Sequence, residues 1–193
     1  MKMTKSKIAA ALALAAVFAL MTGCPNPSTT DNNTDPEATL AEQVVNELGS
    51  ALAAAPAASI RAVGSDQIAA IKAAATARIA ADGLAASQEL DKILPSMIAG
   101  AAAGTQNLGN AAKADVFEIS AKSALESMGK PERKAKLSSG KTLTDAVGSI
   151  SEASVTAVVA SLPPAEAVAS LKAVSNVTVT VVYANAVLSA VAD

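Results

Sequence analysis

The sequence predicts an all-α fold, an alanine-rich bundle of about five to eight helices that follows a disordered tether. About a quarter of the 193 residues are alanine, the strongest helix former. Apolar residues recur at spacings of three and four, as they do along one face of a helix. Residues that cap or break helices divide the chain into segments of helical length.

The N-terminal segment has the pattern of an export signal. Residues 1–7 carry Lys2, Lys5 and Lys7 and no acid, and residues 8–21 form an uncharged apolar run. A positive segment followed by such a run is typical of a signal peptide. A transmembrane helix needs about 20 apolar residues, so the run is short for that role. We therefore expect residues 1–23 to be removed as a signal peptide.

The signal ends in LMTGC, residues 20–24, which resembles the lipobox of bacterial lipoproteins. The resemblance covers residues 1–24, with Met21 in place of the usual leucine. It implies cleavage before Cys24, a diacylglycerol on the Cys24 thiol and acylation of the new amine, with fatty chains such as palmitate. Cys24 is the only cysteine in the chain, and a lone thiol in an exported protein needs an explanation.

Lipid attachment at Cys24 would hold the chain on a membrane, because two or three acyl chains anchor stably. We expect an exported protein on the periplasmic face or at the cell surface, and the choice of leaflet stays open. Residues 24–36 comprise the lipidated cysteine and a polar, flexible tether, whose root-mean-square reach is about 20 Å. Residues 37–193 form the expected helical domain.

Helix signals follow one another along the domain. Asp35 and Pro36 are expected to start the first helix, with an apolar face at Leu40, Val44, Leu48 and Leu52 and an end at Pro56. Ser65 starts a second helix, with Ile68, Ile71 and Ile79 on one side and Gly83 after its end. Ser87 starts a third helix that passes Pro95 and ends at Gly104, and Gly100 and Gly104 favour close packing between helices.

A fourth helix is expected between Asn110 and Gly129, with Pro131 just beyond it. Its inward stripe comprises Phe117, Ala121, Leu125 and Met128. Its polar side comprises Asp115, Glu118, Lys122 and Glu126, where Glu118 and Lys122 have the favourable i,i+4 orientation.

Residues 130–141, KPERKAKLSSGK, hold five basic residues and one acid, and we call them the basic segment. A solvated linker is the simplest interpretation, and binding of acidic lipid headgroups or another anionic partner is the alternative. Valine concentrates after residue 146 and isoleucine before residue 120, so a subdivision of the domain at the basic segment is also considered.

The last part resumes with a capping box from Thr142 to Asp145. Ser151 and the pair Pro163-Pro164 mark further expected boundaries. Residues 177–183, VTVTVVY, have strand propensity, but Thr178, Asn185, Ser189 and Asp193 fall in one polar stripe at helical spacing. We favour a helix there and keep a short strand as the minor alternative.

Composition excludes several kinds of chemistry. The chain has no histidine and no tryptophan, which removes histidine-based catalysis and histidine metal ligation. Three of the 15 basic residues leave with the signal, so 12 remain against 17 acids, and a net charge of −5 argues against nucleic-acid binding. The sequence gives no spacing typical of a metal site and no sign of a cofactor site.

Two apparent catalytic motifs do not hold. Residues 104–109 have the glycine spacing of a phosphate-binding loop, but the lysine that should follow is Asn110. Ser127-x-x-Lys130 and Ser138-x-x-Lys141 fit the nucleophile motif of penicillin-interacting enzymes, whose other two elements are missing. We therefore predict no catalytic residue and no enzyme, and keep as a minor alternative an enzyme that uses only carboxylates, Lys, Ser or Tyr183. The expected function is that of an envelope structural or protein-interaction module, and the alternative is a carrier for a small apolar ligand.

Overall fold

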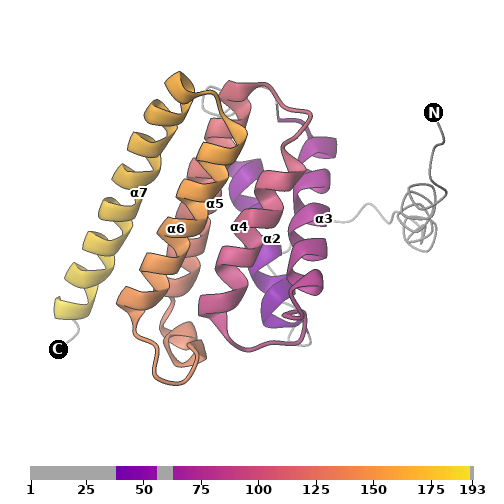
Figure 1. Cartoon of the computed structure of the whole chain (residues 1–193). Coiled ribbons are helices and arrows are strands. Elements are labelled where there is room, and N and C mark those ends of the chain that lie inside the picture. Colours follow the sequence, from indigo (N-terminus) through magenta and orange to yellow (C-terminus); the bar gives the residue numbers. More distant parts are fainter. Residues whose placement is uncertain (1–37, 56–62, 192–193) are drawn as a thin grey trace, which may run out of the picture. The chain divides into compact units, whose positions relative to one another are not determined.

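A computed structural model describes residues 38–55 and 63–191, with side chains up to residue 184. Cys24, the expected signal peptide and the expected tether lie outside these residues. The described residues are all-α, as predicted, and contain six α-helices and one 3₁₀ helix (Figure 1). These are α2 (Leu40–Ala54), α3 (Ser65–Ala81), α4 (Leu90–Gly104), α5 (Asn110–Gly129), η1 (Pro131–Lys136), α6 (Leu143–Ser161) and α7 (Pro164–Val191).

One hydrophobic core draws residues from all six α-helices. α4 packs against α3, α5 and α6, while α5 also contacts α2 and α7 (Figure 1). Phe117, Leu48 and Ile93 are among its largest fully buried side chains, and Ile150 and Val174 bring in the last two helices. The helices before and after the basic segment therefore share this core.

Capping boxes fix the starts of α2 and α6. Thr142 Oγ1 accepts from the Asp145 backbone N at 3.1 Å, and the Asp145 carboxylate accepts from Thr142 N at 2.8 Å, as predicted. The start of α2 is a correction, because its N-cap is Thr39, paired in the same way with Glu42, and not Asp35. The predicted face of α2 at Leu40, Val44, Leu48 and Leu52 is buried.

Two predicted helix boundaries, at Ser87 and at Ser151, are wrong. α4 begins at Leu90 and not at Ser87, whose hydroxyl accepts from Glu89 N at 3.0 Å in the preceding turn. Ser151 marks no boundary, since α6 runs through it to Ser161. Pro95 lies inside α4, as expected, and Gly83 follows α3 with a φ of 74°, a conformation that glycine adopts without strain.

Gly100 and Gly104 bring α4 close to α3, as the sequence predicted. A Cβ added at Gly100 would lie 2.6 Å from the Ala75 Cα and 2.7 Å from the Ala74 carbonyl oxygen. A Cβ at Gly104 would lie 2.7 Å from the Ile71 Cα. Only glycine permits these backbone contacts.

The inward stripe of α5 is buried as predicted at Phe117, Ala121, Leu125 and Met128. The ion pair on the polar side of α5 is a correction, because Lys122 pairs with Glu126 and not with Glu118 as expected. Lys122 Nζ lies 3.7 Å from Glu126 Oε1, one turn further along the helix than Glu118.

The basic segment connects α5 to α6 and is exposed at most of its positions, as expected of a linker, but ion pairs and hydrogen bonds hold it to the bundle, which corrects the simple interpretation as a solvated loop. Residues 131–136 form η1, and the Arg133 side chain turns inward and is buried. Arg133 and Lys130 both bind the Glu47 carboxylate of α2. Ser138 donates to the Asp91 Oδ1 atom of α4 through its backbone N at 2.7 Å and its hydroxyl at 2.9 Å. The basic segment therefore ties α2, α4 and α5 together.

Residues 177–183 belong to the 28-residue helix α7, so the minor strand alternative is wrong. α7 packs along one edge, where Ala167, Ser170 and Val174 are buried. Of the expected polar stripe, Thr178 is half-buried and donates to the Val174 carbonyl at 2.9 Å, while the other members fall outside the described side chains. The buried hydroxyls of Ser120 and Ser170 have no hydrogen-bond partner among the described residues.

Candidate functional site

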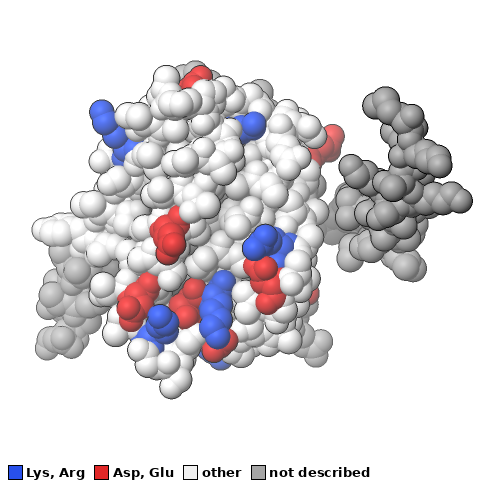
Figure 2. All heavy atoms as spheres, viewed as in Figure 1, with Lys and Arg blue, Asp and Glu red and all other residues white. Residues whose placement is uncertain are grey.

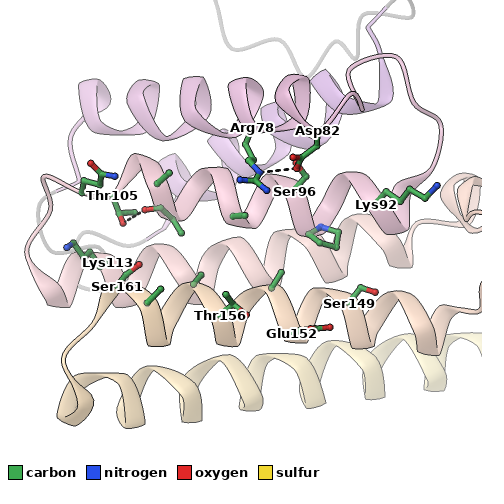
Figure 3. Close-up of a pocket in the computed structure, with 18 of the residues that line it drawn as sticks. Arg78, Asp82, Lys92, Ser96, Thr105, Lys113, Ser149, Glu152, Thr156 and Ser161 are labelled. Atoms are coloured by element: carbon green, nitrogen blue, oxygen red, sulfur yellow. Dashed lines mark hydrogen bonds and ion pairs between the residues drawn. The ribbon is translucent and has the colours of Figure 1, made fainter. Parts of the chain in front are cut away.

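A groove runs between α4 and α6, beneath one edge of α3, and has a volume of about 880 Å³ (Figure 3). Small side chains line its middle, namely Ala99, Ala102, Ala103, Ala153, Ala157 and Ala160. In Figure 3, Ser96 and Ser149 lie toward one end and Thr105 and Ser161 toward the other, so α4 and α6 run in the same direction along the groove. The groove is open to solvent and has no large apolar side chain in its lining.

An ionised cluster stands at one end of the groove. The Asp82 Oδ2 atom accepts from Ser96 Oγ at 2.8 Å and from Arg78 Nε at 2.9 Å (Figure 3). The hydrogen bond from Ser96 and that from Arg78 hold the pKa of Asp82 below its ordinary value. Lys92 pairs with Glu89 at 2.7 Å, and this hydrogen bond raises the pKa of Lys92. Asp82 and Lys92 are therefore charged at neutral pH.

The opposite end of the groove carries Thr105, Gln106, Lys113 and Ser161. The Thr105 side chain is buried and donates to the Ala102 carbonyl at 2.7 Å, which closes the end of α4. Lys113 makes no ion pair with any described residue, so its charge is available to an occupant. Glu152 lies on the α6 wall, exposed to solvent, and is available in the same way.

The polar groups of the groove are hydroxyls, one carboxamide, carboxylates and the cations of lysine and arginine, which can form hydrogen bonds or ion pairs with a bound molecule. Its hydroxyl groups face no histidine, since the chain has none, and the nearby carboxylate of Asp82 is already satisfied by two donors. Among residues 38–55 and 63–191, no group of three or more His, Cys, Asp and Glu side chains is placed to hold a metal ion.

The serines of the two Ser-x-x-Lys matches serve structural contacts. Ser127 is buried at the end of α5, and its Oγ accepts a hydrogen bond from Arg133 Nη1. Ser138 is held by Asp91, and Lys130 is held by Glu47. Neither serine lies in the groove.

Sequence reasoning did not find the groove. Its alanines and serines are ordinary residues for an exposed helix face, and no local pattern separates Ala99 or Ala160 from other exposed alanines. What makes them a site is the distance between α4 and α6, which depends on packing between segments some 50 residues apart. The abundance of small residues was visible in the sequence, but their position on the facing sides of α4 and α6 was not.

No protein-family model matches the chain, and neither a curated protein nor a solved structure matches it.

Proposed function

We propose that this chain is a membrane-anchored lipoprotein, attached through Cys24, whose non-enzymatic helical domain is an envelope structural or protein-interaction module. The proposed interaction module rests on the open, alanine-lined groove between α4 and α6. The proposed lipid anchor rests on the sequence of residues 1–24.

The groove suits an α-helix of a partner protein. Its lining residues on α4 run from Asp91 to Ala103, which corresponds to about 18 Å or just over three helical turns. Alanine side chains on both walls let a third helix approach closely, as helices do when ridges fit into grooves. Binding of an amphipathic helix in a groove is a common mode of protein recognition. Lys113 at one end and Glu152 on one wall would set the orientation of such a helix.

The alternative is a carrier for a small apolar ligand. Pockets for such ligands enclose most of the ligand surface within apolar walls. Here the groove is open, and its lining contains many charged and hydroxyl side chains besides alanine. Native mass spectrometry of the purified domain, compared with the denatured mass, tests this alternative, because a bound lipid would appear as a mass difference that denaturation removes.

The interaction proposal is tested by cross-linking in cells. Ala99→Arg places a long charged side chain in the middle of the groove, whereas Ala73→Arg makes the same change at another exposed helical alanine, on α3 and outside the groove lining. We expect a specific cross-linked partner with the wild type and with Ala73→Arg, and at least a tenfold loss with Ala99→Arg. An equal yield from both variants would show that the groove is not the contact surface.

The anchor is tested separately by metabolic labelling with palmitate. The label should enter the wild-type chain and not Cys24→Ser. Equal labelling of the two chains would contradict lipid attachment at Cys24, whatever the cross-linking experiment shows.

A further inference from the structure

The outer surface of α7 is unusual for a helix exposed to water. Val168, Val179 and Val182 are exposed, and their spacings of 11 and 3 place them within about 60° of one another around the helix axis. The neighbouring helix α6 adds the exposed residues Val155 and Val159. We call these five residues the valine face. Figure 2 shows that the surface over α7 is largely without charge.

Lys172 is the one charged residue on the α7 side that carries these valines, and the surface otherwise lacks the charge and the helix propensity of an ordinary solvent face. No charged residue occurs in α7 after Lys172, and Val179 is 66% exposed. Valine is a weaker helix former than alanine, lysine or glutamate, so its use at exposed positions has no local advantage. Exposed apolar patches of this kind mark contact surfaces.

Among the described residues, the segment Pro164–Ala184 has the length and apolar composition of a membrane-spanning helix, and few of its residues are buried. Ala167, Ser170 and Val174 nevertheless pack α7 against the bundle. Only the outer side of α7 is therefore free to contact a membrane. This arrangement fits a helix that lies along an apolar boundary with one side in the protein.

We propose that the valine face lies against the lipid bilayer to which the chain is anchored. This inference rests on the proposed function, because the lipid on Cys24 supplies the bilayer. Residues 25–39 between the anchor and α2 extend to at most about 50 Å, so the domain cannot leave the neighbourhood of the membrane. A tether of this length raises the effective concentration of the bilayer, and weak apolar contacts then suffice.

A second copy of the chain fits the valine face less well. In a dimer formed through the valine face, the same surface of each copy would contact the other, as in an isologous interface. The one charged residue of α7 beyond its first turn is Lys172, so two such helices would bring together like charges and no ion pair. A bilayer requires no such complementarity. Because the five valines are uncharged, we expect apolar contact to supply most of the binding, and only Lys172, which lies about 20° from Val179 around the helix axis, to make it sensitive to salt and to the charge of the lipid headgroup.

The composition of the chain provides both the anchor and the reporter for a test. Cys24 is the only cysteine, so a maleimide-bearing phospholipid couples the mature chain to vesicles at the natural position. Tyr183 is the only tyrosine, the chain has no tryptophan, and Tyr183 is 71% exposed beside Val182. Its fluorescence therefore reports the surroundings of the valine face without labelling.

We couple the chain to phosphatidylcholine vesicles and measure quenching of Tyr183 by acrylamide in water and by brominated acyl chains in the bilayer. The expected result is quenching by the brominated lipid and an acrylamide quenching constant at least twofold lower than for the uncoupled chain. The triple variant Val168→Ser, Val179→Ser, Val182→Ser should lose both effects. The matched variant Ala69→Ser, Ala73→Ser, Ala77→Ser changes exposed positions on α3 and should retain them.

Quenching by acrylamide alone in the coupled wild type would overturn the proposal. Protection that grows with protein concentration in the absence of vesicles would overturn it in favour of a second copy. Circular dichroism and the urea midpoint confirm that each variant is folded. Because the coupling is chemical, this result is independent of the palmitate and cross-linking experiments: unlabelled Cys24 in cells together with lipid quenching in vesicles would refute the anchor and not the affinity of the valine face for lipid.

Discussion

Arg133 and Glu47 form a two-contact ion pair across 86 positions of the sequence, with Nη1 2.8 Å from Oε2 and Nη2 2.7 Å from Oε1. The Arg133 side chain is 5% exposed, and its Nη2 also donates to Gln43 Oε1 at 3.3 Å. Parallel contacts between a guanidinium and a carboxylate are the strongest geometry for such a pair. This ion pair attaches the basic segment to α2.

Glu47→Gln should lower the free energy of unfolding by about 3 kcal/mol, because it leaves the buried guanidinium without its counter-charge. Urea unfolding followed by circular dichroism measures the change. Glu126→Gln removes the exposed partner of Lys122 and should cost less than about 0.5 kcal/mol. Equal losses of unfolding free energy in the two variants would mean that the buried ion pair stabilises the fold no more than the exposed one.

Acid should weaken the fold through the same carboxylate. Burial raises the pKa of Glu47, but hydrogen bonds from Lys130 and Arg133, together with their positive charges, outweigh burial and hold it below its ordinary value of 4.5. A lowered pKa stabilises the folded state above the unfolded pKa, and this contribution is lost as the pH falls through the folded pKa.

The expected result is a larger fall in the urea midpoint between pH 7 and pH 3 for the wild type than for Glu47→Gln. Asp82, Glu89 and Asp145 also have lowered pKa values, but they are present in both proteins and cancel in the comparison. The same fall in both proteins would show that Glu47 does not contribute to acid sensitivity.

Two glycines of the bundle should respond oppositely to alanine. Gly100→Ala places a Cβ within 3 Å of the α3 backbone and should destabilise the protein by about 1–3 kcal/mol through overpacking. Gly148→Ala in α6 meets no atom within 4 Å and should stabilise it by about 0.5–1 kcal/mol. Thermal unfolding distinguishes the two signs, and a gain at Gly100 would mean that α3 and α4 separate without cost.

The N-cap of α6 should be sensitive to loss of its hydroxyl group. Thr142→Ala removes the acceptor for Asp145 N and should lower the free energy of unfolding by about 1 kcal/mol. Thr144→Ala, two residues further on and outside the capping box, should change it by less than about 0.5 kcal/mol. Urea unfolding of both variants gives the comparison.

Local signals predicted the helices and local signals also misplaced some of their ends. The capping box at Thr142 was correctly interpreted because it depends on residues within one turn. The one-turn spacing of Gly100 and Gly104 correctly indicated a close helix contact, but it did not identify α3 as the partner. The start of α2 was predicted too early, at Asp35 and Pro36, because these residues are also favoured at the start of a helix. The capping box that Thr39 forms with Glu42 is of the same kind as the one at Thr142 and was overlooked.

The basic segment could not be interpreted from its own composition. Lysine, serine and glycine are equally suitable for a solvated loop and for a segment held by distant acids. The difference lies in Glu47 and Asp91, which are 86 and 47 positions from their partners Arg133 and Ser138. The groove was missed for the same reason, since Ala99 and Ala160 come together only when α4 and α6 pack.

The narrow attachment of α7 has a consequence for local opening of the fold. Its buried edge includes Ser170, which faces the packed interior with no hydrogen-bond partner in the described residues, as does Ser120 on α5. Buried hydroxyls without partners lower the cost of separating two helices. Amide protons of α7 should therefore exchange with deuterium long before those of α3 and α4, whose backbones touch at Gly100, so that the last helix of the chain is the first to detach in the native state.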